Sequence, residues 1–560
     1  MGRAASRRLA GAGVLAALGA AWLIWLLPPA PLAAPGVPVA DDVRVAYHVH
    51  TRRSDGTGSV EEVAAAARRA GLAAVIVTDH GDGTRATDPP RYIDDVLVIH
   101  GVEVSTWAGH YAALGAAASP YPLGGEPEAV VDDVRRLGGF GIVAHPGSSK
   151  ADLKWRDWDA SFDALEWLNA DSEWRDRPRD LWRALVTYPV RPSATITALL
   201  DRPVFELAQW DRLTARRPVV GLAGHDAHAR LGLRGVGEPY DGYVALRAPE
   251  YAPMFSAFSN VARLTRPLTG EAGPDAAAVM AALAAGHTYA VITGLAPSGR
   301  VRFTVRSGGA AAGMGDHLVP AGRVVVDFAA DAPVGARATL WCDGAVVVED
   351  DAAQMQWTAA GSPGACRVEV TVRGSRIPWL VTNPVYVRSA LTEPAPRQMG
   401  APQLIVPLAG SGDAARWAAE VSTGADGRAT AVADRAATVA FNWRLGKGGG
   451  QYSAVRFDMA EALAPFDRLI LRAQADRPMR MWIQLRVPHD GGRRWGRSVY
   501  LDQMPREIVI LWSDLAPLDP DGPRSVPLAD VTSLLLVVDT VNAREGAGGT
   551  VTFGELWLAR

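Results

Sequence analysis

Cysteine is scarce in this chain, because only Cys342 and Cys366 occur among its 560 residues. Two cysteines can form one disulfide, but two buried free thiols fit the sequence equally well. An excess of charge of one sign is also missing, since 57 basic residues are balanced by 60 acidic residues without a long basic run. This balance disfavours nucleic acid as a partner. The chain has no repeat of fixed period either, so nothing in it indicates a repeat architecture.

The first 36 residues depart from this balanced composition. Three arginines precede an apolar run over residues 9–27, and two prolines end the run. A basic head before an apolar stretch is typical of an export signal, and the run also approaches the length of a membrane span. We therefore expect residues 1–36 to be a signal peptide or an N-terminal membrane anchor. In both cases the rest of the chain is expected on the periplasmic or extracellular side.

The chain is too long for one hydrophobic core, and its pattern of apolar runs and helical stretches changes along its length. Residues 40–292 alternate apolar runs such as VRVAYHVH, AAVIVTDH and GIVAHPG with helical stretches, which predicts a parallel sheet, open or closed into a barrel. Residues 297–389 are β-rich without helical stretches and predict a β-sandwich. A Pro-rich linker is expected over residues 390–402, followed by a jelly-roll-like domain over residues 403–560.

Histidines gather in the first of these regions. Eight of the eleven lie between residues 48 and 228, and most of them end an apolar run. In a parallel α/β barrel the carboxyl ends of the strands converge on one face, and the HxH spacing points both rings to one face of a strand. Imidazoles together with carboxylates suit divalent Zn, Mn or Fe. We therefore expect a metal site built from these residues: His48, His50, Asp55, His80, Glu103, His110, His145, Asp226 and His228.

The order of these motifs resembles the polymerase and histidinol phosphatase family, called PHP. The resemblance covers roughly residues 43–290, and its motifs are His48-Val-His50, Ser54-Asp55-Gly56, Thr78-Asp79-His80, Gly101-Val-Glu103, His110, His145-Pro146 and Gly224-His-Asp226-Ala-His228. It implies a distorted (β/α)7 barrel with two or three divalent ions. A looser resemblance of the β-rich extension points to the exported branch that includes carbamate hydrolases.

The resemblance also implies how the ligands are shared. One ion would be held by His48, His50, Glu103 and Asp226. Glu103 would bridge to a second ion held by His110 and His145, and a third would be held by Asp55, His80 and His228. Glu103, His145 and Asp226 would be the catalytic residues.

The chemistry predicted for such a site is hydrolysis, because bound metals lower the pKa of water so that hydroxide forms at neutral pH. Our first interpretation is an exported phosphoesterase acting on a small-molecule ester. A carbamate, ester or amide hydrolase on the same metals is the second, and a non-catalytic surface binding protein is the third. A phosphoesterase should add cations near the metals, for which Arg52, Arg53, Lys150, Arg230 and Arg234 are available. A carbonyl hydrolase should present apolar walls, for which Trp155, Trp158, Trp167 and Trp174 are available.

Several further residues near the motifs have weaker assignments. Asp79 is expected to orient a neighbouring ligand, and His100 and His225 are expected to be structural. Glu166 and Asn169 end another strand and could line the mouth of the site. The C-terminal aromatic residues Trp482, Trp495 and Tyr500 could bind carbohydrate or a partner protein, or could belong to a core.

Overall fold

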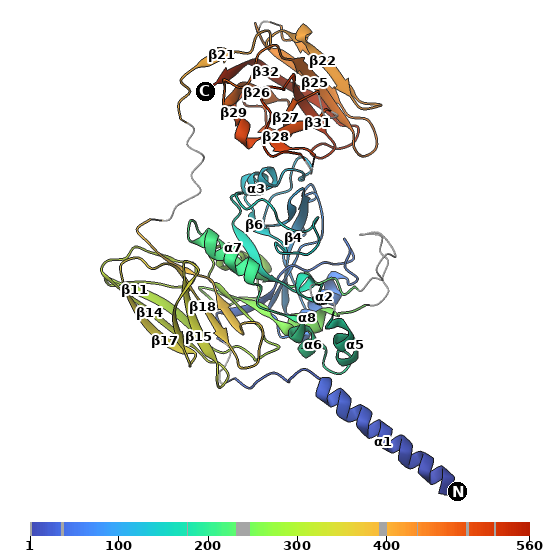
Figure 1. Ribbon diagram of the computed structural model, residues 1–560, viewed down its shortest axis with the longest axis vertical. Coiled ribbons are helices and arrows are strands. Elements are labelled where there is room, and N and C mark those ends of the chain that lie inside the picture. The colour runs from blue at the N-terminus through green and yellow to red at the C-terminus, as the bar shows by residue number, and fades with distance from the viewer. Residues whose placement is uncertain are drawn as a thin grey trace.

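The computed structural model describes residues 3–34, 39–175, 177, 179–230, 247–390, 400–433, 435–488, 492–519 and 522–560. Arg234 and most of the expected linker lie outside these residues. Helix α1 (Arg3–Leu26) precedes a mixed α/β region, which continues into β-rich layers, and a separate β-rich domain ends the chain (Figure 1). Among the described residues, no helix is both long and apolar enough to cross a membrane.

A curled sheet forms the centre of the α/β region. Its strands are β1 (Asp42–Ala46), β2 (Ala74–Val77), β3 (Arg91–Ile93), β4 (Val96–Thr106), β5 (Gly109–Leu114), β6 (Phe140–Val143), β7 (Ala164–Asn169), β8 (Val220–Gly224), β9 (Ser259–Arg263) and β10 (Thr288–Val291). The pairs β1–β2, β2–β4, β6–β7 and β7–β8 are parallel, as the sequence predicts. However, β3, β5 and β9 run antiparallel to their neighbours, so the prediction of a parallel sheet is wrong for these three strands.

The two sides of the curl meet where β8 ends beside β1. His225 N donates to Tyr47 O at 2.9 Å, and Ala227 N donates to His48 O at 3.2 Å. These bonds bring the segments after β1 and after β8 together, so ligands at opposite ends of the α/β sequence become neighbours.

Helices cover the curled sheet: α2 (Val60–Arg69), α3 (Pro127–Arg136), α4 (Ala170–Arg175), α5 (Leu181–Thr187), α6 (Pro192–Leu199), α7 (Val204–Thr214), α8 (Tyr251–Ala257) and α9 (Ala272–Ala284). Helix α2 shows why such a segment is helical. Ser59 accepts from the Glu62 backbone while the Glu62 side chain accepts from the Ser59 backbone, which is a capping box. Val60 and Val63 lie on its buried face, and acidic residues in the first turn and basic residues in the last suit the helix dipole.

The region after β10 contains one sheet of its own, with the order β12 (Ala310–Ala312), β11 (Val301–Ser307), β14 (Arg323–Ala330) and β17 (Gln354–Ala360). The other strands extend the curled sheet: β13 (His317–Leu318), β15 (Arg337–Cys342), β16 (Ala345–Asp350), β18 (Gly364–Thr371), β19 (Leu380–Thr382) and β20 (Val385–Val387). The link is the antiparallel pair β10–β19, with Tyr289 opposite Thr382. Residues 297–389 are therefore two β-layers, one of which is continuous with the α/β region.

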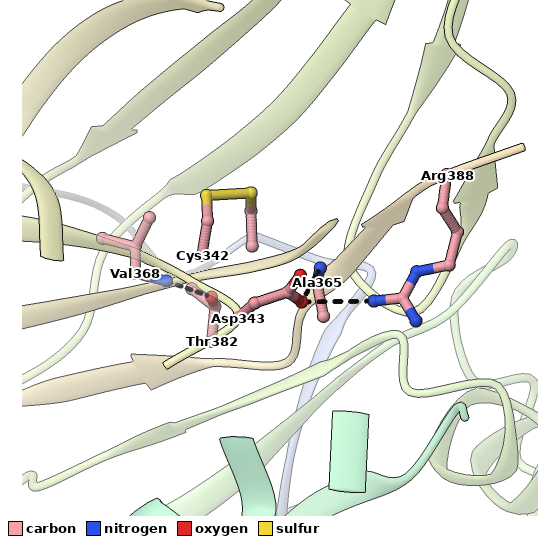
Figure 2. The surroundings of a disulfide bond; sticks show 7 residues. Cys342, Asp343, Ala365, Val368, Thr382 and Arg388 are labelled. Carbon is pink, nitrogen blue, oxygen red and sulfur yellow. Dashed lines mark hydrogen bonds and ion pairs between the residues drawn. A yellow bond between two sulfur atoms is a disulfide. The ribbon is translucent and has the colours of Figure 1, made fainter. Parts of the chain in front are cut away.

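The two cysteines are joined in a disulfide between β15 and β18 (Figure 2). Cys342 and Cys366 are directly opposite in the antiparallel register, and their Cα atoms are 4.1 Å apart. Beside the bond, Asp343 accepts from Ala365 N at 2.8 Å and pairs with Arg388 at 3.3 Å. Of the two alternatives open in the sequence, the structure shows the disulfide.

The C-terminal domain consists of two six-stranded antiparallel sheets that share a hydrophobic core. One sheet contains β21 (Ile405–Pro407), β23 (Asp426–Ala431), β24 (Val439–Arg444), β26 (Arg468–Ala475), β29 (Arg506–Leu511) and β32 (Gly548–Ala559). The other contains β22 (Trp417–Val421), β25 (Tyr452–Asp458), β27 (Met479–Arg486), β28 (Arg494–Leu501), β30 (Ala516–Pro517) and β31 (Ser533–Asp539). This agrees with the expectation that residues 403–560 are rich in β-strands.

The C-terminal domain packs on the α/β region through β27, β28 and α3. Arg480 Nε donates to Asp133 Oδ2 at 2.7 Å, and both side chains are buried. Trp482 stacks on Trp107 with ring centroids 4.9 Å apart. Trp495 donates to the carbonyl of residue 523, and Tyr500 lies under the Arg136 guanidinium. Binding of carbohydrate or a partner protein by these aromatic residues stays a prediction.

Candidate metal centre

The predicted ligands converge where the strands of the curled sheet end. His48 and His50 follow β1, His80 follows β2, and His145 follows β6. Glu103 lies within β4 and His110 within β5, while Asp55 lies in the loop before α2 and the last two ligands, Asp226 and His228, follow β8. One detail of the sequence interpretation is wrong, because β1 ends at Ala46 and the HxH motif lies beyond the strand. Both rings reach the site through the turn after β1, not through strand alternation.

Three ligands have left-handed backbone conformations. The φ angles are 64° at His48, 30° at His145 and 47° at Asp226. Such conformations cost non-glycine residues free energy and persist where the surrounding structure imposes them, often at functional sites. Each of these residues is the second residue after a strand, so the turn directs its side chain into the site.

Glu103 is the carboxylate at the centre of the site. Its Oε2 lies 3.1 Å from Nε2 of both His48 and His50 and 3.3 Å from His80 Nδ1. Its Oε1 lies 2.9 Å from His110 Nδ1 and 3.0 Å from His145 Nε2. One carboxylate thus faces five imidazoles from different loops and strands.

A second set of contacts surrounds Asp55 and Asp226. Asp226 Oδ1 is 3.4 Å from Nε2 of both His48 and His50 and 3.5 Å from His228 Nδ1. Asp55 Oδ2 is 3.1 Å from His228 Nε2, and Asp55 Oδ1 is 3.7 Å from His80 Nε2. The nine predicted ligands therefore form overlapping clusters: His50, Asp55, His80 and His228; His48, His50 and Asp226; His48, Glu103 and His145; and His80, Glu103 and His110.

The donor set fits divalent ions. His48 Nε2 and His50 Nε2 are only 3.1 Å apart and both face carboxylate oxygens, an arrangement that suits a shared cation. Asp55 Oδ1 is buried and accepts no hydrogen bond from any residue that the structure describes, and a buried carboxylate oxygen without a partner is costly. Imidazole and carboxylate are the ligands that Zn, Mn and Fe use in proteins.

Glu166 is the residue that the sequence interpretation undervalued. Its side chain is fully buried, and Oε1 accepts from His48 Nδ1 at 2.5 Å. Its Oε2 accepts from His145 N and from Asn169 Nδ2, both at 2.7 Å. A carboxylate on Nδ1 fixes the imidazole tautomer and leaves Nε2 as the ligand atom. The only sequence signal was the position of Glu166 near the end of an apolar run.

The loop that carries Asp55 is held by Asp79. Asp79 Oδ1 accepts from Thr51 N at 2.6 Å and from Ser54 Oγ at 2.7 Å. This agrees with the expectation that Asp79 orients a neighbour. His225 contacts the carbonyls of Tyr47 and Phe258, as expected for a structural histidine.

Burial and opposite charges shift the pKa values in the site. Burial raises the pKa of Glu103, but the facing imidazoles, led by His48 and His80, hold it well below its usual range. Burial opposes the charged form of His50, yet Asp226 and Glu103 raise the pKa of His50 to about 10. Burial lowers the pKa of His80 to about 4. At neutral pH Glu103 is therefore ionised and His80 is neutral, whereas His50 holds a proton that a metal must displace.

Metal binding is accordingly expected to release protons. Below the pKa of about 10, His50 of the metal-free protein is protonated, and a ligand imidazole must be neutral. Metal affinity should therefore fall as the pH is lowered, by about tenfold per pH unit for each proton released. Calorimetric titration at pH 7 in two buffers with different ionisation enthalpies checks this. An observed enthalpy that is the same in both buffers would mean that no proton leaves.

The predicted cationic residues lie in different surroundings. Arg52 pairs with Glu62 at 2.6 Å, and Arg53 pairs with Asp88 at 2.6 Å. Lys150 lies in the loop after His145, and its pKa is lowered by burial and by the nearby charge of Arg175, against the opposing effect of Asp226 and Asp55. The part of the chain that the structure describes includes Arg230 but not Arg234. Lys150 is thus a predicted cation whose pKa is influenced by the charges of the ligands Asp226 and Asp55.

The four tryptophans that could form an apolar wall lie in different surroundings. Trp155 and Trp167 are fully buried in the main core, and Trp158 packs against Phe162 and Phe205. Trp174 differs, because it stacks under the Arg175 guanidinium at 4.6 Å.

Comparison with protein families agrees with the ligand pattern of the first strands. Residues 46–113 match the family model of the PHP domain. No curated protein matches the chain. One similar solved structure is a two-domain protein from Bacteroides vulgatus that contains a predicted PHP-like metal-dependent phosphoesterase. It is 12% identical to this chain with a TM-score of 0.28, and the match covers 64% of this chain and 99% of that one. A family 11 carbohydrate-binding module from Clostridium thermocellum is also 12% identical, with a TM-score of 0.22 and coverage of 26% and 88%.

Proposed function

We propose that this chain, whose α/β region carries a PHP domain, is a metal-dependent phosphoesterase. The observation that carries the proposal is the convergence of three carboxylates and six imidazoles on one centre, with Glu103 in contact with five of the rings. We also propose that the curled sheet is the distorted (β/α)7 barrel of that family, with β5 and β9 as its antiparallel strands.

The chain's own residues would hold two or three divalent ions, of Zn, Mn or Fe. His50, Asp55, His80 and His228, which form one cluster, would hold one of these ions, and Glu103, which belongs to two further clusters, would contribute to holding the others. When bound, such ions supply an activated water molecule and offset negative charge on a phosphate. Glu166 keeps His48 Nε2 directed at the site through its bond to Nδ1.

Cationic side chains near the ligands favour an anionic substrate over a neutral carbamate. Burial and the charge of Arg175 lower the pKa of Lys150, against the opposing charges of Asp226 and Asp55. Arg175 itself pairs with Asp171 at 2.5 Å. Phosphate esters carry negative charge that such side chains attract. Because Trp155 and Trp167 are buried in the core, neither presents a face to a substrate, and we retain phosphoester hydrolysis as the preferred reaction.

Replacing Lys150 with glutamine should weaken the binding of phosphate esters. Loss of one charge-assisted contact is expected to raise KM about tenfold with little change in kcat, because the contact is made in both the bound substrate and the transition state. The effect should shrink at high ionic strength. Steady-state kinetics on an aryl phosphate measure both parameters.

Arg52→Gln is the matched control, because it removes the same charge from a side chain that pairs with Glu62. Its KM should equal that of the unmodified protein. Equal kinetics for the Lys150 and Arg52 variants would exclude Lys150 from substrate binding.

Export of the enzyme is part of the proposal. The basic head and the apolar run of residues 9–27 support it, and the disulfide between Cys342 and Cys366 is typical of oxidising compartments. A reporter enzyme fused after residue 45 should be translocated. Reporter activity confined to the cytoplasm would contradict this assignment.

A further inference from the structure

An apolar pocket of about 270 Å³ lies between α4, α5, α6 and α8. Trp174, Leu185, Ile196 and Met254 are among its lining residues. Its polar groups already have partners. The hydroxyl of Tyr188 accepts from Glu250 N at 2.8 Å, and that of Thr195 donates to Thr187 Oγ1 at 3.0 Å. A pocket of this kind offers burial to hydrocarbon and little to a polar group.

Two chain connections link the pocket with the candidate metal centre. Ala170 lines the pocket and directly follows Asn169, whose Nδ2 lies 3.5 Å from Asp226 Oδ2. Met254 lines the pocket and lies one helical turn after Tyr251 on α8, and the Tyr251 hydroxyl donates to His50 O at 2.8 Å. The junction of β7 with α4 and the helix α8 therefore each combine a contact to a ligand residue with a residue of the pocket wall.

A cationic side chain borders the pocket. Arg175 stacks on the pocket residue Trp174 at 4.6 Å and pairs with Asp171 at 2.5 Å. Burial lowers the pKa of Arg175, but Asp171 and also Asp226 raise it. A cation that is influenced by the charge of the ligand Asp226 therefore lies beside the apolar pocket.

The pocket opens onto an apolar patch of the surface. Leu185 lines the pocket with 65% of its area exposed, and Trp182 on the same helix is 53% exposed. Exposed apolar patches mark surfaces that bind proteins, membranes or apolar ligands, and the pocket beside this patch favours a ligand. A hydrocarbon chain could enter across this patch while its head group meets the cations.

We propose that the substrate is an amphiphile, namely a phosphate monoester of an alcohol with a long hydrocarbon chain, and that this pocket holds the chain. The proposal rests on the phosphoesterase function above and adds its substrate class. In the reaction the oxygen of water bonds to phosphorus, the ester P–O bond breaks and a proton from water goes to the leaving alkoxide. The products are the free alcohol and inorganic phosphate.

The test is calorimetric titration of the full chain, loaded with metal, with n-alkylphosphonates from ethyl to decyl. These compounds keep the head group and cannot be hydrolysed at the P–C bond. Each methylene that enters the pocket should raise the affinity about fourfold until the pocket is full. The same titration with n-alkanols measures the pocket without the head group.

Leu185→Asp should remove the dependence on chain length and leave ethylphosphonate binding unchanged. Val204→Asp is the control, because Val204 is 64% exposed on α7 and is not among the pocket residues. Both positions are exposed, so both variants should fold, which melting curves verify.

The outcomes separate this inference from the proposed function. Phosphonates that bind with the same affinity at every chain length would overturn the amphiphile proposal and leave the phosphoesterase standing. A Leu185→Asp variant whose phosphonate affinity still rises with chain length as in the unmodified protein would overturn it as well. Alkanols that bind according to length, with phosphonates no tighter than alkanols, would show a real pocket without a phosphate site and would reject both proposals for the substrate.

Discussion

Glu103→Gln should reduce metal-dependent hydrolysis of phosphate esters by about 10³-fold, because a cluster of metals contributes several kcal/mol of transition-state stabilisation. The two oxygens of Glu103 lie 2.9–3.3 Å from five imidazole nitrogens. Glutamine keeps the shape but loses the charge and turns an N–H₂ group toward part of the cluster. Metal content by elemental analysis should fall together with the rate.

The matched control is Glu369→Gln, another buried carboxylate, which lies on β18 and pairs with Arg202 at 2.8 Å outside the site. This change should lower stability without changing the metal content of the folded protein. A Glu103 variant with full metal content and full activity would show that this carboxylate does not hold the metals.

Glu166→Gln is expected to lower metal affinity by about 10–100-fold, the range found when a carboxylate behind a metal-binding histidine is removed. The carboxylate accepts from His48 Nδ1 at 2.5 Å and from His145 N at 2.7 Å, so it positions two ligands without belonging to the clusters. An amide can accept at only one of its two atoms, which leaves either the imidazole or the backbone N–H without its acceptor.

Titration of the metal-free variant with metal while activity is followed distinguishes this positioning role from a catalytic one. Excess metal should restore most of the rate at an unchanged KM for the substrate. A rate that stays low at saturating metal would assign Glu166 to the chemistry itself. Metal affinity equal to that of the unmodified protein would remove it from the site altogether.

The sequence predicts the convergence of the nine ligand candidates because each lies in a short motif near an apolar run. Glu103 and His110 are examples, since they lie within the strands β4 and β5. The capping box of Ser59 and Glu62 is likewise a feature of local spacing. These features depend on local spacing, which one sequence contains.

Features that depend on pairing between distant segments could not be predicted in the same way. The antiparallel direction of β5 and β9 and the pairing of β10 with β19 arise from contacts between distant segments. The left-handed conformation of His48 places its ring where strand alternation would not. Glu166 resembles any acidic residue in a strand until the bond with His48 is seen.

The sequence alone also could not show which surface cations are available to a substrate. Arg52 and Lys150 both flank motif loops in the sequence, but Arg52 pairs with Glu62 whereas Lys150 is linked electrostatically to Asp226. Arg175 was not predicted, but it stacks on Trp174, which lines the apolar pocket. Side-chain partners decide which cation is available to a substrate.

The central claim is metal-dependent phosphoester hydrolysis at the centre around Glu103, and one rate comparison tests it most directly. The purified protein is stripped of metal, and turnover of an aryl phosphate and of the matching aryl carbamate is followed while Zn, Mn or Fe is added back. We predict that phosphate turnover appears only with added metal and that the carbamate stays intact. Turnover of the carbamate without turnover of the phosphate, or phosphate turnover that needs no metal, would contradict the claim.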